Sequence, residues 1–252
     1  IICGGLGFGI YKEINDRLIN RFMAKHRRLR VQWTPYFKLV MIATGILLAG
    51  GTLSIFAVSA PHAAEPLGQH LWNCLFDSVT ARTAGFNISD YSRYLPAASL
   101  IMCGLMVVGG SPGGTAGGMR TTTCAIAGAE ILRILRGRDH VEFFHRRIDQ
   151  RTVARCVITV VVSCAWIGCF TILICSLEPA MNSLDIFFEN CSAFATVGVS
   201  RGITPLLSEP SKYLLIINML AGRVGLFAFL IALAGTPTPR HYRYPSVKIP
   251  LT

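Results

Sequence analysis

Two long stretches of this chain contain no charged residue. Leu39–Ala60 and Cys156–Leu177 are equal in length and consist mostly of apolar side chains. A helix needs about 20 such residues to cross the hydrocarbon core of a bilayer, and both stretches reach that length. Only 15% of the whole chain is charged, whereas a soluble domain contains about 25% charged residues. The sequence therefore predicts an all-α, polytopic membrane protein rather than a soluble globular or disordered chain.

Two further uncharged or nearly uncharged stretches are interrupted. Leu95–Met119 has no charge, but seven of the ten residues of Gly109–Gly118 are glycine or proline, so we expect a break there. Tyr213–Gly235 is long enough to span, but Arg223 lies near its middle. A guanidinium at the bilayer centre costs about 2.5–3.5 kcal/mol on insertion scales. Arg223 is therefore expected to face the bundle interior or water.

Two shorter apolar stretches follow the two spans. Leu71–Phe86 and Leu184–Val199 contain acidic side chains and are too short to cross a bilayer. We interpret them as re-entrant segments that enter the membrane and return to the same side. Their acids Asp77 and Glu189 have two alternative roles: they raise the cation concentration near a pore mouth, or they stabilise the re-entrant helices.

The basic residues lie in blocks between the apolar runs. The regions 11–38 and 120–155, with the tail after Gly235, hold 19 of the 24 Lys and Arg residues. By the positive-inside rule these regions are cytoplasmic, and the re-entrant segments enter from outside the cell. Blocks of this kind are typical of a multi-pass protein of the plasma membrane, and we expect no nucleic-acid partner. Ile1–Ile10 has no basic residue before it, so we interpret it as the end of a membrane segment rather than a signal peptide.

The two re-entrant segments align with each other without a gap. Trp72–Phe86 pairs with Asp185–Val199, which places Thr83 on Thr196 and Gly85 on Gly198. Both segments end in Thr-x-Gly followed by an apolar residue. Such a stretch can turn successive backbone carbonyls toward an axis, as in filters that replace the hydration shell of a potassium ion. The alternative is that each glycine merely ends a helix at the membrane surface.

These residues resemble the Trk/Ktr/HKT superfamily of potassium transporters, and in particular its bacterial KtrB-type membrane subunits. The resemblance runs through nearly the whole chain in the order of the family. It is carried by TARTAGFN (Thr80–Asn87), GGSPGGTAGGMRTTT (Gly109–Thr123), VEFFHRRI (Val141–Ile148), SAFATVGVSRGITP (Ser192–Pro205), AGRVGLF (Ala221–Phe227) and YRYP (Tyr242–Pro245). By this resemblance GGLGF (Gly4–Phe8) is what remains of the last helix of the preceding repeat.

The resemblance implies a potassium-channel-like architecture of repeated helix–re-entrant pore loop–helix units, of which this chain holds the third and fourth. The implied divisions are the remnant of the preceding repeat's inner helix (1–10), a cytoplasmic basic linker (11–38), the third repeat (39–138), a cytoplasmic linker (139–155), the fourth repeat (156–235) and a cytoplasmic tail (236–252). The implied selectivity filter binds K⁺ through the backbone carbonyls of Thr83, Ala84, Gly85, Phe86, Thr196, Val197, Gly198 and Val199.

The resemblance also implies a gate below the filter. It assigns this role to Arg223 together with the glycine-rich loop, whose residues are Gly109, Gly110, Ser111, Pro112, Gly113, Gly114, Thr115, Ala116, Gly117 and Gly118. One alternative for the loop is a packing surface, because Gly114 and Gly118 have GxxxG spacing. A nucleotide-binding P-loop is a poorer match, because Thr115 occupies the position of its lysine.

The expected function is a membrane-embedded pore subunit of a potassium uptake system, with no enzymatic activity and no cofactor in this chain. The family implies a homodimer in the lipid bilayer that binds a cytoplasmic ring of nucleotide-binding regulatory subunits. Sodium coupling and the choice between K⁺ and Na⁺ stay open, because the first two repeats would contribute to them.

Two alternatives from other classes remain. One is a secondary transporter in which the glycine-rich loop and Arg223 bind an anionic substrate. The other is a membrane enzyme that uses His140, His145 and Glu142, although these residues have neither metal-site spacing nor a nucleophile beside them. The nine cysteines show no spacing typical of zinc.

Overall fold

The computed structural model describes residues 1–22, 33–59, 66–114, 116–144 and 146–234, and this part of the chain is mainly helical. Thr115, His145 and the expected cytoplasmic tail therefore lie outside the described residues. The helices are α1 (Ile2–Gly5), α2 (Phe8–Phe22), α3 (Pro35–Val58), α4 (Leu67–Thr80), α5 (Pro96–Val107), α6 (Thr121–Leu135), α7 (Gln150–Leu177), α8 (Ser183–Ala195), α9 (Glu209–Val224) and α10 (Leu226–Ala234). The short strands β1 (Glu142–Phe143) and β2 (Arg146–Arg147) pair antiparallel between α6 and α7.

The two uncharged stretches form the longest helices, α3 and α7. In the described part of the chain these two are long and apolar enough to cross a membrane, and α9 with α10 gives a third if they count as one broken span. α3 begins at Pro35, where the side chain of Thr34 accepts a hydrogen bond from the Phe37 N–H at 3.2 Å. α7 begins at Gln150, so it takes in the last residues of the linker that was expected at 139–155.

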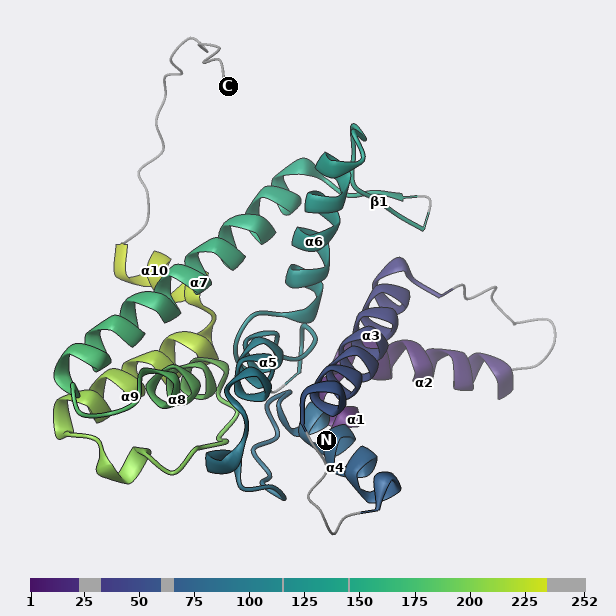
Figure 1. The fold of residues 1–252 in the computed structure, drawn as a ribbon. Helices are drawn as coiled ribbons and strands as arrows, with labels where there is room; N and C mark the ends of the chain where they lie inside the picture. The colour runs from purple at the N-terminus through teal and green to yellow at the C-terminus, as the bar shows by residue number, and fades with distance from the viewer. Residues whose placement is uncertain (23–32, 60–65, 115, 145, 235–252) are drawn as a thin grey trace, which may run out of the picture.

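The two predicted re-entrant segments each contain one short helix. α4 ends at Thr80 and α8 ends at Ala195, so each helix stops just before its Thr-x-Gly sequence. α4 packs on α3, and α8 packs on α5, α7 and α9. Figure 1 shows α3 and α4 on one side of α5 and the helices α7, α8 and α9 on the other.

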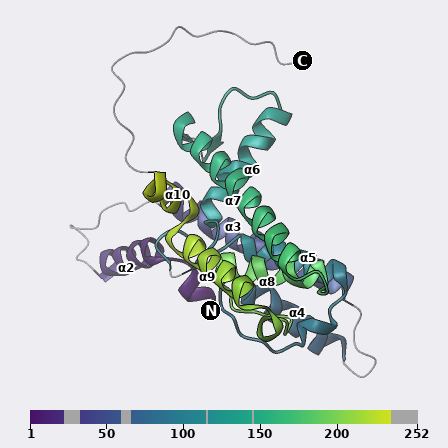
Figure 2. The ribbon, with the colours of Figure 1, turned by 90° about the vertical axis from the view of Figure 1, so that its left-hand side faces the viewer.

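Both of the interrupted stretches are broken helices. α5 ends at Val107, and helical structure resumes at Thr121 after the glycine-rich loop, as the sequence predicts. Tyr213–Gly235 also does not form one straight helix. α9 ends at Val224, Gly225 adopts φ +94°, and α10 continues at an angle of 104° to α9 (Figure 2). The sequence pattern did not predict this bend.

The bend is stabilised by packing between α10 and α7. Phe229 of α10 meets Trp166 of α7 edge to face, with 6.0 Å between the ring centroids. The main core lies where α5 meets α8, and it contains the fully buried side chains of Met102, Met106, Phe188 and Phe194. This contact between α5 and α8, together with the packing of α6 on α7, joins the first half of the described chain to the second.

Candidate functional site

The two Thr-x-Gly segments, Thr83–Phe86 and Thr196–Val199, share an unusual backbone conformation. Thr83 and Thr196 have φ +65° and +51°, and Gly85 and Gly198 have φ +74° and +91°. Among the described residues only one other non-glycine residue, Phe144, has a positive φ. A β-branched residue in this region is strained. Positive and negative φ values therefore alternate over the same four positions in both segments.

The structure brings these two segments together although they lie in opposite halves of the sequence. A methyl group on Gly85 would lie 2.4 Å from the carbonyl oxygen of Val197 and 3.7 Å from the Cα of Gly198. In the second segment Val197 and Val199 are buried, whereas Phe86 at the end of the first is 61% exposed. The two segments are therefore in close contact through the backbone at Gly85, Val197 and Gly198.

The first Thr-x-Gly segment is anchored to the helix that precedes it. The hydroxyl of Thr80 donates to the carbonyl of Phe86 at 2.7 Å and accepts from the N–H of the same residue at 2.9 Å. One turn earlier, the carboxylate of Asp77 accepts from the hydroxyls of Tyr91, at 2.8 Å, and of Tyr94. Asp77 is 1% exposed, so its carboxylate fixes the chain after the segment instead of facing solvent.

The second segment is anchored by a different carboxylate. Glu189 of α8 accepts from the backbone N–H of Arg201 and from the hydroxyl of Thr204, both at 2.9 Å, and from the hydroxyl of Ser200. The residue is buried. Of the two roles that the sequence left open for Asp77 and Glu189, the geometry favours stabilisation of the re-entrant segments.

The position that corresponds to Asp77 in the second segment is Asn190. Its side-chain amide donates to the carbonyl of Ile167 at 2.8 Å and to the hydroxyl of Thr171 at 2.9 Å, and its oxygen accepts from Asn218 at 2.6 Å. Trp166 in turn donates to Asn218 at 2.8 Å. This polar network ties α8 to α7 and α9. Its residues did not stand out in the sequence, because single polar side chains on apolar helices carry no motif.

The glycine-rich loop, Gly109–Gly118, lies directly against the second Thr-x-Gly segment. A methyl group on Gly117 would lie 2.3 Å from the hydroxyl oxygen of Thr196. The N–H of Gly118 donates to the carbonyl of Gly222 on α9 at 3.2 Å. At the other side of the loop, the N–H of Ser111 donates to the carbonyl of Gly5 at 3.0 Å. The loop therefore contacts the N-terminal residues, one Thr-x-Gly segment and α9 at once.

Two arginines lie near this loop. Arg223 is an exposed residue in the last turn of α9, next to Gly222, which receives the bond from the loop. Arg82 is only 9% exposed, and its Nη2 donates to the carbonyl of Gly109 at 3.4 Å. Arg82 was not among the residues predicted for the filter or the gate. Its position directly before Thr83, as the one basic residue of Leu71–Phe86, was the available signal.

The residues of the enzyme alternative lie elsewhere. His140 and Glu142 are near the β-hairpin between α6 and α7, remote in sequence from both Thr-x-Gly segments. In the described ranges no group of three or more His, Cys, Asp or Glu residues is placed to hold a metal ion. The described part of the site consists of backbone carbonyls, glycines and a few buried polar side chains.

Comparison with known proteins places this arrangement in a family. The family model described as "TrkH: Cation transport protein" matches residues 1–244. The chain is 35% identical over 250 residues to the Ktr system potassium uptake protein B of Vibrio alginolyticus, covering 97% of the chain and 52% of that protein. It is 32% identical over 251 residues to the Ktr system potassium uptake protein D of Bacillus subtilis (strain 168), covering 99% of the chain and 54% of that protein.

A solved structure shares the fold. The crystal structure of the potassium transporter TrkH from Vibrio parahaemolyticus superposes with a TM-score of 0.69 at 18% identity, over 92% of this chain and 50% of that one. The match confirms the predicted all-α, polytopic membrane architecture. The chain spans about half the length of the relatives that it matches. It belongs to the TrkH family of cation transport proteins, and it is accordingly a multi-pass membrane protein of a transport family and not an enzyme.

Proposed function

We propose that this chain forms part of the pore of a potassium uptake system, with the two Thr-x-Gly segments as two of the segments that line its selectivity filter. Potassium would bind to the backbone carbonyls of Thr83–Phe86 and Thr196–Val199, which take the place of its hydration shell. Transport of this kind needs no covalent chemistry. The names of the relatives, which are potassium uptake proteins, support K⁺ as the cargo.

One observation carries the proposal. Two segments far apart in the sequence have positive φ at the same two positions and lie against each other. Helix ends that merely carried a terminal glycine would have no reason to share a strained threonine or to meet. Both segments are held in place by hydrogen bonds, as a filter with fixed oxygen positions requires. Thr80 donates to Phe86, and the carboxylates of Asp77 and Glu189 accept from groups that follow each segment.

We extend the proposal to the glycine-rich loop, which with Arg223 would act as a gate on the pathway from the filter. The close contact between Gly117 and Thr196, the first residue of the second Thr-x-Gly segment, supports this role. Because most of its residues have no side chain, the loop can rearrange with little steric hindrance.

The proposed assembly is a homodimer in the lipid bilayer that binds a cytoplasmic ring of nucleotide-binding regulatory subunits. The support for both partners is the family resemblance. Sodium is a second possible cargo or a coupled ion, since one relative, 31% identical over 260 residues, is the potassium/sodium uptake protein NtpJ of Enterococcus hirae.

The test is rubidium and potassium uptake by the complete gene product, expressed with its regulatory partner in cells that lack their own potassium uptake. Wild type would be compared with Gly198→Ser, which places a side chain at φ +91°. We expect wild type to restore growth at low potassium, and we expect the variant either to lose uptake or to admit sodium. The amount of each protein in the membrane must be measured alongside.

Other results would count against the proposal in distinct ways. Uptake unchanged by Gly198→Ser would refute the filter at Thr196–Val199 while leaving cation transport intact. If a well-expressed wild type moved no cation but supported uptake of an anion, the anion transporter with substrate at the glycine-rich loop and Arg223 would be the better interpretation.

A further inference from the structure

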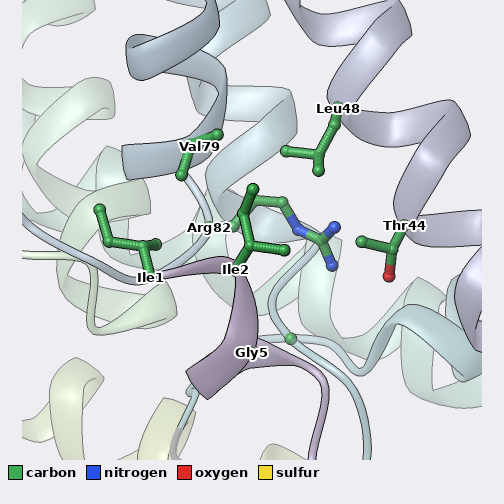
Figure 3. Close-up of a pocket in the computed structure, with 8 residues that line it drawn as sticks. Ile1, Ile2, Gly5, Thr44, Leu48, Val79 and Arg82 are labelled. Atoms are coloured by element: carbon green, nitrogen blue, oxygen red, sulfur yellow. The ribbon is translucent and has the colours of Figure 1, made fainter.

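Arg82 borders a small cavity between α3, α4 and the N-terminal residues. The cavity has a volume of about 20 Å³. Figure 3 shows the guanidinium of Arg82 extending from the end of the α4 segment toward Thr44 of α3, with Ile2 beside it. The other side chains that line the cavity are uncharged. A cavity of this size accommodates a single water molecule.

Two polar atoms at this cavity lack a protein partner. The Nε of Arg82 and the hydroxyl oxygen of Thr44 are both buried, and neither has a hydrogen-bond partner among the described residues. The two side chains are 9% and 8% exposed. Buried polar groups are nearly always hydrogen-bonded, through ordered water where no protein group is in reach. A donor on Arg82 and a hydroxyl on Thr44 are two of the partners that such a water needs.

The same guanidinium connects the two functional segments. The backbone of Arg82 is held at the end of α4 by a 3.2 Å bond from its N–H to the carbonyl of Val79, and the next residue is Thr83. Its Nη2 donates to Gly109, the first residue of the glycine-rich loop. The carbonyl of Gly109 also accepts from the hydroxyl of Thr121, while the Gly109 N–H donates to Met119 at 2.8 Å. Gly109 is thus fixed at several points, and Arg82 is its link to the first Thr-x-Gly segment.

We propose that Arg82 is a positioning residue that fixes the first Thr-x-Gly segment relative to the glycine-rich loop, through its bond to Gly109 and through one water molecule shared with Thr44. The inference rests on the proposed filter and gate. Arginine suits this position because its planar guanidinium carries several N–H donors that point in different directions. The Nε can therefore donate to the water while Nη2 donates to the carbonyl of Gly109. Lysine has the charge but a single nitrogen, which cannot occupy both places.

The test compares Arg82→Lys, Arg82→Gln and the pair Thr44→Val and Thr44→Ser in the complete protein. Thr44→Val removes the hydroxyl at nearly constant side-chain volume, whereas Thr44→Ser keeps the hydroxyl and removes only the methyl group. Arg93→Lys is the matched control, because it is the same change at an arginine whose side chain is 80% exposed. The readouts are the potassium concentration at half-maximal uptake, the maximal rate per protein in the membrane, and the preference for K⁺ over Na⁺.

We expect Arg82→Lys and Arg82→Gln to raise the half-saturating potassium concentration on the order of fivefold, as expected for one lost hydrogen bond, and to weaken the preference for K⁺. Thr44→Val should move both quantities in the same direction by about twofold, and Thr44→Ser and Arg93→Lys should match wild type. If the Arg82 variants do not reach the membrane, the Thr44 pair decides the question. Identical behaviour of Thr44→Val and Thr44→Ser would overturn the shared water.

A lower maximal rate with unchanged half-saturation and ion preference in the Arg82 variants would mean that Arg82 only supports folding, which would overturn the inference. Gly198→Ser in the same assay separates this result from failure of the proposed function. If Gly198→Ser alters ion preference and the Arg82 variants do not, the filter stands and only the role of Arg82 is wrong. If Gly198→Ser changes nothing, the filter assignment itself fails.

Discussion

Gly85 of the first Thr-x-Gly segment lies against the carbonyl oxygen of Val197 in the second. A methyl group on Gly85 would lie 2.4 Å from that oxygen, which is closer than a carbon and an oxygen atom that are not bonded can approach. Gly85 also has φ +74°. Both its conformation and its surroundings therefore exclude a side chain, and the contact makes the geometry of each segment depend on the other.

A Gly85→Ala substitution should impair transport strongly. An L-residue in the left-handed region costs about 1–2 kcal/mol, and relief of the contact with Val197 would displace one of the two segments. We expect potassium uptake per protein in the membrane to fall at least about tenfold, the change that corresponds to 1.4 kcal/mol.

The control for this experiment is Gly45→Ala in α3. Gly45 has no heavy atom within 4 Å of the added methyl group, and it lies within a regular helix. Its substitution should leave uptake within about twofold of wild type, because alanine is favoured over glycine in a helix. Equal effects of the two substitutions would contradict the importance of the contact between the segments.

Gly222→Ala should destabilise the packing of α9 on α8. A methyl group on Gly222 would lie 1.7 Å from the carbonyl oxygen of Phe194, a backbone atom that cannot move by itself. Overpacking of this kind costs about 1–3 kcal/mol, so the thermal midpoint of the detergent-solubilised complete protein should fall. Gly168→Ala in α7, where the methyl group meets nothing within 4 Å, is the matched control and should not lower it.

The features that the sequence predicted are those with a strong one-dimensional signal. The uncharged runs mark α3 and α7, and the Gly/Pro-rich decapeptide marks the break between α5 and α6. The repeated Thr-x-Gly pointed to two equivalent segments, and both have positive φ at the threonine and at the glycine. The placement of these elements in the membrane repeats, and the roles of filter and gate, remain predictions.

Other features depend on partners far away in the chain. The bend after Val224 needs the packing of Phe229 on Trp166, and the apolar composition of the segment fits a straight helix as well as a bent one. Asp77 and Asn190 occupy equivalent positions but bond to different groups, because only the first segment is followed by two tyrosines in reach. Arg82 could be recognised as a link only after the chain had brought Gly109 beside it.

Arg201→Met should weaken the junction between the two halves of the chain. Arg201 pairs with Asp185 at 2.7 Å, and its guanidinium also donates to Ser99 on α5 and, at 3.1 Å, to the carbonyl of Ser92. Its side chain is 9% exposed, and removal of one partner from a buried pair costs about 3–5 kcal/mol. Because Asp185 is partly exposed, we expect a loss near the lower end of that range.

The comparison for Arg201 is Lys212→Met, which breaks the exposed pair of Lys212 with Glu209. Exposed pairs contribute about 0–1 kcal/mol, so this variant should be close to wild type in thermal midpoint. A similar loss of stability in both variants would show that Arg201 contributes no more than a surface charge.

Glu178, at the end of α7, should make stability depend on pH in the acidic range. Hydrogen bonds from Ser208 and Ser211 lower the pKa of the Glu178 carboxyl below its usual value. The backbone N–H of Ser208 donates to this carboxylate at 2.8 Å, and the Ser211 hydroxyl donates to it at 2.9 Å.

Because the pKa of the Glu178 carboxyl is lower in the folded state than in the unfolded state, the carboxylate stabilises the fold above the unfolded pKa of about 4.3. This contribution is lost as the pH falls through the folded pKa. The gap in thermal midpoint between wild type and Glu178→Gln should therefore be constant from pH 7 to about pH 5 and close at lower pH. Ser211→Ala removes one donor and should reduce that gap without abolishing it, whereas a gap that is the same at every pH would contradict the assignment.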